Sequence, residues 1–206
     1  MLFLGTFLLY ALVPTRNFNY ADDALRWAYG ITQSSGLIQS HHLYLNAMRW
    51  LWHALTDIGL PIAPERLLAL HSALSGAVTL VFLRRLLRQL GLGGVATLGA
   101  LVCAWTAGFW TYAIVGDVYV PATAWLVVGL YGFCRGLRAE TPRAARGGFL
   151  IACSAWVLLL LHHQAQFVFV AAVLPATLLV RSTPLARRAT IALGDPTVVG
   201  LATLAI

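Results

Sequence analysis

The sequence has no lysine, few acidic residues and few cysteines. All fourteen of its basic residues are arginine, and only seven of its 206 residues are aspartate or glutamate. Charged residues make up 10% of the chain, whereas a soluble domain of this size carries roughly 25%. This composition excludes a soluble globular domain and indicates an integral membrane protein. The absence of lysine indicates a bias toward GC-rich codons and implies no physical requirement.

Several motifs of soluble enzymes are also missing. The sequence contains no glycine-rich phosphate loop, no serine–histidine–aspartate nucleophile context and no zinc motif. Its three cysteines, Cys103, Cys134 and Cys153, fall in or beside apolar stretches at spacings that match no metal motif. We interpret them as small packing residues. The chain also lacks internal repeats and low-complexity tracts.

Apolar stretches separated by arginine clusters dominate the rest of the sequence, which is 60% hydrophobic. Basic loops of membrane proteins stay on the cytoplasmic side, so the clusters predict a multi-span protein whose arginine loops share one face. The net charge of +7 then reflects this bias, and no nucleic-acid partner is expected. The clusters are Arg84, Arg85 and Arg88; Arg135, Arg138, Arg143 and Arg146; and Arg181, Arg187 and Arg188.

The hydropathy pattern predicts an all-α, polytopic transmembrane helix bundle in which residues 1–206 form one domain of about six to seven membrane segments. The predicted segments are residues 1–14 (the outer part of a first span), 64–83, 95–115, 118–134, 149–161 and 167–180. Asp195 and Pro196 then predict the capped start of another span. Because only ten residues follow Pro196, we expect this chain to be the N-terminal part of a longer protein.

Residues 15–63 are predicted to form an outer loop with two amphipathic helices that lie in the membrane interface. The first helix places Ala24, Leu25, Ala28 and Ile31 on its apolar face and Asp22, Asp23 and Arg26 on its polar face. The second places Tyr44, Met48, Leu51, Trp52 and Leu55 on its apolar face and Asn46, Arg49 and His53 on its polar face.

The predicted topology gathers most acids and histidines on the outer face. They are Asp22 and Asp23, the turn residue Asp117, and the pairs His41–His42 and His162–His163. Carboxylates act as general bases or bind metals, and imidazoles bind phosphate or metals or transfer protons.

Structural roles stay open for each of these residues. Either Asp22 or Asp23 can cap a helix, Asp22 can pair with Arg26, and Asp117 can stabilise its turn. Adjacent histidines on a helix point about 100° apart, so a histidine pair at a helix end is not expected to contact one ligand with both members. His71, inside a predicted span, is expected to hydrogen-bond to a neighbouring helix and is left out of the site.

Four short motifs resemble those of the GT-C superfamily of membrane glycosyltransferases, in particular the bacterial branch related to protein O-mannosyltransferases. They are Tyr20-Ala-Asp22-Asp23-Ala-Leu-Arg26, His41-His42-Leu-Tyr44, Asp117-Val-Tyr119 and the helix end His162-His163-Gln164. The resemblance covers roughly the N-terminal half of a family member, and the missing half usually contributes to donor and acceptor binding.

The resemblance implies transfer of a sugar from a polyprenyl-phosphate donor to a glycan, lipid or protein acceptor. It implies that Asp22 or Asp23 is the general base and that Asp117 orients the acceptor or a metal. It makes His41, His42 and His163 contacts of the donor phosphate. The wider set of donor- or acceptor-binding residues is Arg26, His41, His42, Tyr44, Asp117, Tyr119, His162, His163 and Gln164.

No cofactor is required by the resemblance, but a divalent metal stays open, with Asp22, Asp23 and Asp117 as its ligands. The expected location is the bacterial inner membrane, among membrane lipids. The basic loops would be cytoplasmic and the active face periplasmic or extracellular.

Two other functions stay open, a transporter subunit and a non-catalytic membrane scaffold. A transporter predicts polar residues and broken helices near the middle of the membrane. Here the predicted spans are nearly free of charge and the polar residues gather at one interface, which favours interfacial chemistry. A scaffold predicts that the outer acids can be replaced freely.

Overall fold

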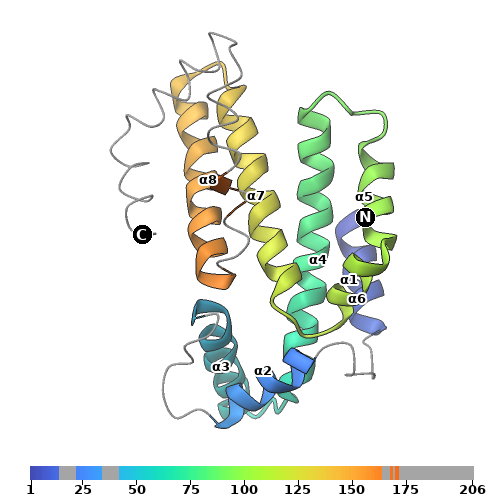
Figure 1. Ribbon diagram of the computed structural model, residues 1–206, viewed down its shortest axis with the longest axis vertical. Helices are drawn as coiled ribbons and strands as arrows, with labels where there is room; N and C mark the ends of the chain where they lie inside the picture. Colours follow the sequence, from blue (N-terminus) through green and yellow to red (C-terminus); the bar gives the residue numbers. More distant parts are fainter. Residues whose placement is uncertain (14–21, 34–41, 164–167, 169, 172–206) are drawn as a thin grey trace.

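A computed structural model describes residues 1–13, 22–33, 42–163, 168, 170 and 171. This part of the chain is helical, as predicted (Figure 1). Three of its helices are long and apolar enough to cross a membrane, or four if a bent pair counts as one span. The helices are α1 (Leu2–Leu12), α2 (Asp22–Gln33), α3 (His42–Asp57), α4 (Pro64–Gln89), α5 (Ala96–Trp105), α6 (Ala107–Ile114), α7 (Tyr119–Leu137) and α8 (Pro142–His162).

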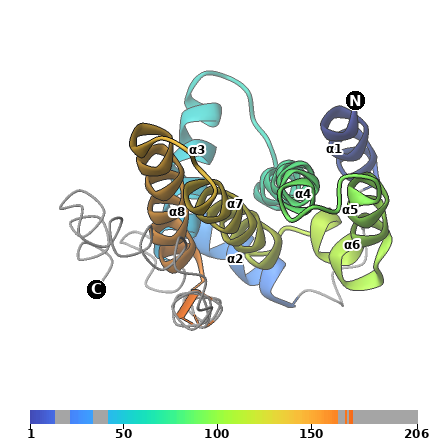
Figure 2. The ribbon, with the colours of Figure 1, turned by 90° about the horizontal axis from the view of Figure 1, so that it is seen from above.

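Helix α4 lies at the centre of the bundle (Figure 2). Helices α7 and α8 pack on one side of it, and α1, α5 and α6 pack on the other. Pro64 and Glu65 stand in its first turn, as the sequence predicts for a helix start, because proline needs no amide partner there and an acid complements the helix dipole. The helix continues through the first arginine cluster to Gln89, beyond the predicted end at residue 83.

Glycines bring α7 and α8 into close contact. A Cβ atom on Gly148 would collide with the backbone of Gly136, and one on Gly132 would lie 2.8 Å from the backbone nitrogen of Ala152. Trp156 packs directly against Gly129. Since lipid is as apolar as leucine, helices in a membrane associate through such close packing more than through the hydrophobic effect.

Tyr10 attaches the short helix α1 to the bundle. Its side chain is buried, its hydroxyl donates to the carbonyl of Ala104 at 3.1 Å, and its ring packs against Gly76 of α4 and Trp110 of α6. At the same end of α1, Arg66 donates to the carbonyl of the next residue, Ala11, at 3.2 Å. The end of α1 therefore lies beside the start of α4.

The span predicted over residues 95–115 is not one unbroken helix. The structure has two helices, α5 and α6, that meet at an angle of 68°. Thr106 between them is extended, and its hydroxyl donates to the carbonyl of Cys103 at 2.8 Å. Threonine side chains compete for helix carbonyls in this way. Trp105 and Trp110 stack across the bend with ring centroids 5.3 Å apart, which holds it.

Helices α2 and α3 lie across the end of the bundle where α4 begins (Figure 1). Gly59, with a φ of 80°, ends the turn after α3, and the Trp52 indole donates to the carbonyl of Ile62 at 2.8 Å. A glycine at positive φ is the usual way to end a helix. These contacts shape the connection from α3 to α4 and keep α3 beside the start of α4.

Both helices of the predicted outer loop are present, but the residues that each buries against the rest of the protein differ in part from its predicted apolar face. Leu25 was placed on the apolar face and is 51% exposed, while Trp27 is buried. In α3, Asn46 is buried and Leu51 is 42% exposed. The reason is that α2 and α3 pack against each other and against α4, which selects a different buried face than a flat membrane surface would.

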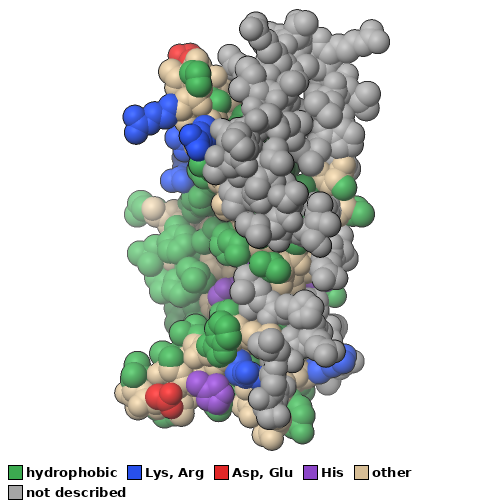
Figure 3. Space-filling view, turned by 90° about the vertical axis from the view of Figure 1, so that its left-hand side faces the viewer, with side chains coloured by type: hydrophobic (Ala, Val, Ile, Leu, Met, Phe, Trp, Pro, Cys, Tyr) green, Lys and Arg blue, Asp and Glu red, His purple; other side chains and the backbone are tan. Residues whose placement is uncertain are grey.

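The first two arginine clusters lie at the end of the bundle away from α2 and α3, where α4 connects to α5 and α7 connects to α8 (Figure 1). On the face that Figure 3 shows, the described side chains between the two ends are mainly hydrophobic. Arg143 and Arg146 belong to α8, which begins at Pro142 and not at the predicted residue 149, because Thr141 caps it by accepting from the Ala144 amide. The third cluster and the predicted segment after 195 lie outside the described residues. Of the predicted segment 167–180, residues 168, 170 and 171 are described, and they are helical.

We predict that Gly148→Ala destabilises the protein and that its neighbour variant Gly147→Ala does not. A methyl group on Gly148 meets the backbone of α7, whereas one on Gly147 meets nothing within 4 Å. Overpacking costs about 1–3 kcal/mol, while alanine in place of an exposed helical glycine stabilises by up to about 1 kcal/mol. Thermal unfolding of both variants in one detergent, followed by tryptophan fluorescence, measures the difference. Equal melting temperatures would contradict the proposed helix contact.

Candidate functional site

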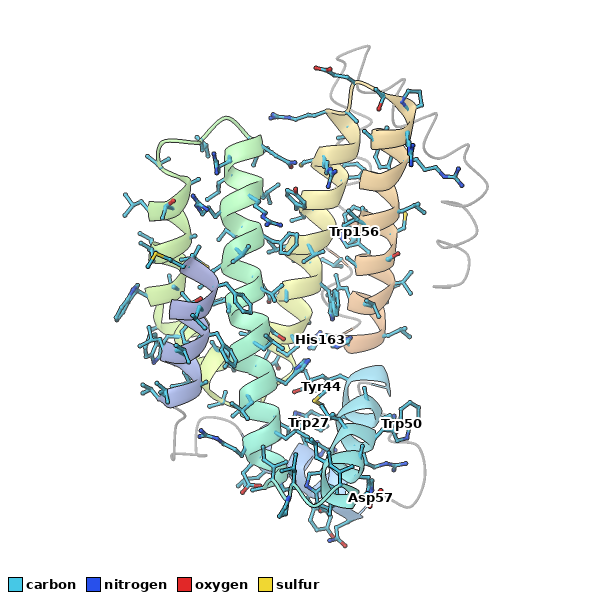
Figure 4. The ribbon with its side chains drawn as sticks, turned by 180° about the vertical axis from the view of Figure 1, so that it is seen from behind. Trp27, Tyr44, Trp50, Asp57, Trp156 and His163 are labelled. Atoms are coloured by element: carbon cyan, nitrogen blue, oxygen red, sulfur yellow. The ribbon has the colours of Figure 1, made fainter. Side chains whose placement is uncertain are left out.

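A group of polar side chains, all buried except the partly buried His71, lies where α3 meets the bundle. We call Tyr44, His71, Ser72, Asp117 and His162 the junction cluster. They come from α3, α4, the turn before α7, and the end of α8. Figure 4 places Tyr44 and His163 together at this junction and Asp57 at the far end of α3. Two sequence motifs expected at one face, around Asp117 and around His162, are thus brought together.

Asp117 is the centre of the junction cluster. It is 2% exposed, and its Oδ1 accepts from the amide of Val118 at 2.6 Å, at the start of α7. A helix N-terminus favours a negative charge, so this bond compensates part of the cost of burying the carboxylate. The preceding Gly116 lies so close to Leu68 that an added Cβ would come within 2.5 Å of it. Glycine therefore allows the turn to pack tightly against α4.

The backbone carbonyl of Asp117 joins three elements. It accepts from the hydroxyl of Ser72 in α4 at 3.1 Å and lies 3.5 Å from the hydroxyl of Tyr44 in α3. Burial, and then the negative charge of Asp117, raise the pKa of Tyr44 above its ordinary value. The phenol therefore stays protonated and able to donate at physiological pH.

Two imidazoles flank Tyr44. Its ring centroid is 5.3 Å from that of His71 and 5.6 Å from that of His162. His162 Nδ1 lies 2.8 Å from the carbonyl of Leu158, and its Nε2 lies 3.3 Å from the indole nitrogen of Trp125. A carbonyl only accepts and an indole only donates, so Nδ1 carries the proton and Nε2 accepts. Both nitrogens are engaged within the protein, which makes His162 a positioning residue in this conformation.

His163 and Tyr119 lie beside the cluster. Their rings are 5.2 Å apart, and Tyr119 also contacts Tyr112 of α6 at 5.1 Å. His163 ends α8 in an extended conformation and is half-buried. The expectation that adjacent histidines face different surroundings agrees with these contacts, since His162 contacts Tyr44 and Trp125 while His163 contacts Tyr119.

Other predicted site residues are not brought into the cluster. Arg26 is exposed on α2, with its guanidinium 5.7 Å from the Trp27 ring centroid. Asp22 and Asp23 begin α2, and His42 begins α3, but their side chains are outside the described part of the chain. His41 and Gln164 also lie outside the described residues. Among the described residues, no three histidine, cysteine or acidic side chains are grouped as metal ligands.

The sequence interpretation missed His71, Ser72 and Trp125. His71 was expected to hydrogen-bond to a neighbouring helix, but the described residues offer its buried Nδ1 no hydrogen-bond partner. The sequence did carry one indication that His71 belongs to a candidate functional site. It lies two turns inside an apolar helix, and ionisable residues within membrane helices are often functional. Nothing in the sequence pairs Trp125 with His162, which are 37 residues apart.

The cluster combines a buried carboxylate, a protonated phenol and two imidazoles at one end of the bundle, opposite the described arginine clusters. Such groups can orient hydroxyl groups and exchange protons. Comparison of the chain with protein-family models, with curated proteins and with solved structures finds no match.

Proposed function

We propose that this protein is a membrane glycosyltransferase that moves a sugar from a polyprenyl-phosphate donor to a glycan, lipid or protein acceptor at the outer face of a bacterial inner membrane. The observation that carries the proposal is the gathering of polar groups at the end of the bundle covered by α2 and α3. A lipid-linked donor keeps its tail in the bilayer and its head group at the interface, so its chemistry needs polar groups at that depth.

The first-loop acids would supply the base. Asp22 and Asp23 begin α2, and α2 packs against α3 and α4 beside the junction cluster. In the proposed reaction one carboxylate removes the proton of the acceptor hydroxyl, and the oxygen attacks the anomeric carbon. The bond from that carbon to the phosphate oxygen breaks, and polyprenyl phosphate leaves. Asp117 is too deeply buried to contact the acceptor in this conformation and would act by positioning.

We predict that removing the base abolishes transfer. In the full-length gene, Asp22→Asn or Asp23→Asn should lower kcat by about 10²–10⁴-fold, the usual contribution of a general base. Asp57→Asn is the matched control because Asp57 is an exposed aspartate at the far end of α3. The measurement is transfer of radiolabelled sugar from polyprenyl-phosphate donors in purified membranes. Unchanged transfer in both first-loop variants would remove the proposed mechanism.

The proposed orientation is tested by thiol labelling. In a chain whose three cysteines are replaced by alanine, single cysteines are introduced as Asp57→Cys and Glu140→Cys, at opposite ends of the bundle. A membrane-impermeant maleimide should label the first in intact cells with a permeabilised outer membrane, and the second only after lysis. Positive-inside bias predicts this result because Glu140 lies among the arginines. Labelling of both from one side would contradict the topology.

A transporter is the second candidate, and the bend at Thr106 favours it. Ten residues of α5 rise by about 15 Å, so the bend falls near the middle of a bilayer core about 30 Å thick. Transporters place broken helices there, next to a water-filled cavity. One observation argues against a transporter. The side chains around the bend are aromatic, among them Trp105, Phe109 and Trp110, and such side chains pack against lipid or protein and do not line a water-filled cavity.

Water access at the bend distinguishes the two candidates. In the same cysteine-free chain, the glycosyltransferase proposal predicts that Thr106→Cys reacts poorly with a charged maleimide. A cysteine that faces lipid or protein forms little thiolate, and the thiolate is the reactive form. Glu140→Cys serves as the fully reactive control. Labelling of Thr106→Cys at a comparable rate would favour a transport path through the bend.

A further inference from the structure

The junction cluster is mostly closed to solvent, but His71 is not. Tyr44 is 1% exposed, Asp117 2% and His162 7%. His71, in contrast, is only partly buried and keeps accessible surface at the edge of the cluster. A ligand that approaches the cluster in this conformation therefore meets His71 before it meets the carboxylate.

His71 is also poorly satisfied within the protein. Its ring packs against Tyr44 and lies near His162, but the described residues offer no hydrogen bond to either ring nitrogen, and Nδ1 is fully enclosed. A neutral imidazole carries one donor and one acceptor. Because Nδ1 is enclosed, a ligand can reach only Nε2, and a polar group bound there would satisfy the nitrogen that the protein leaves open.

We propose that His71 binds a hydroxyl group of a sugar or similar polyol, as the contact that recognises the acceptor. The inference rests on the proposed glycosyl transfer and assigns its acceptor contact. A hydroxyl group both donates and accepts, so it satisfies the accessible Nε2 whether that nitrogen carries the proton or not.

Charge favours a hydroxyl over a phosphate at this position. Within the described part of the junction cluster, the charged side chain is the carboxylate of Asp117, which lies next to Tyr44. A phosphate bound at His71 would face this negative charge across a medium of low dielectric constant, where like charges repel strongly. A neutral hydroxyl group pays no such cost.

The first test measures binding without any transfer reaction. The wild-type protein in nanodiscs is treated with diethyl pyrocarbonate, which acylates accessible unprotonated histidines, and the modification of His71 is followed by peptide mass spectrometry. Two probes share one alkyl tail: octyl glucoside carries neutral hydroxyls, and octyl phosphate carries an anion. The exposed His53 of α3 reports general shielding by either amphiphile.

We expect octyl glucoside to slow the modification of His71 by roughly threefold or more, the factor that mass action gives when about two-thirds of the sites are occupied. Octyl phosphate should have no effect, and His53 should react equally with both. Equal protection by the two probes, protection by phosphate alone, or no protection at all would overturn the inference.

The second test uses the transfer reaction. His71→Ala should raise the KM for the acceptor by roughly tenfold, the effect of losing one hydrogen bond to an uncharged group, and leave the donor KM unchanged. His71→Gln keeps a polar atom near the Nε2 position, the nitrogen that a ligand can reach, and should restore part of the affinity, while His53→Ala should change neither constant. A raised donor KM would overturn the inference. An inactive wild-type protein would reject the proposed function, and the protection experiment would still decide whether His71 binds hydroxyls.

Discussion

The tight turn at Gly116 and Asp117 is the constraint on which the rest of this end of the protein depends. The carbonyl of Asp117 accepts from Ser72 in α4 and lies within reach of the hydroxyl of Tyr44 in α3, and its carboxylate accepts from the amide of Val118, the residue before α7. Because these groups are buried, each needs its partner. The turn thus links the interfacial helices to the membrane-crossing helices.

Close helix packing supplies the rigid frame around that turn. Glycines on α7 and α8 let the two backbones touch, and Tyr10 fits against Gly76 to hold α1 on α4. Such contacts orient the helix ends that carry Ser72 and His162. The helix bundle is apolar along its length and polar at its ends. Polar side chains that could take part in a reaction therefore lie at the end that α3 covers.

Burial divides the polar residues into two groups. Asp117, Tyr44 and His162 have partners within the protein and are sealed, so they position one another. His71 keeps both exposed surface and unsatisfied nitrogens, which are the features of a group that binds something. Under the proposed function, the acids at the start of α2 and the imidazole of His71 would contact a ligand at the end of the bundle that α2 and α3 cover.

Several features followed from the sequence because they depend on local or one-dimensional properties. Apolar stretches and arginine clusters predicted the helices and the placement of the first two clusters at one end, since charges cannot enter the bilayer core. Pro64–Glu65 marked a true helix start, whereas α8 begins at Pro142 and not at the predicted residue 149. Motif positions also predicted that Asp117 and the His162–His163 pair share an end of the bundle.

Other features were decided only by tertiary structure. The bend at Thr106, the burial of Asn46 and the exposure of Leu25 depend on neighbours distant in sequence. The role of His162 required Trp125, and the choice of His71 over its more conspicuous histidine neighbours required knowing which rings have partners. A sequence shows which residues are polar and at what depth they lie, but hydrogen bonding depends on atoms that come together only when separate helices pack.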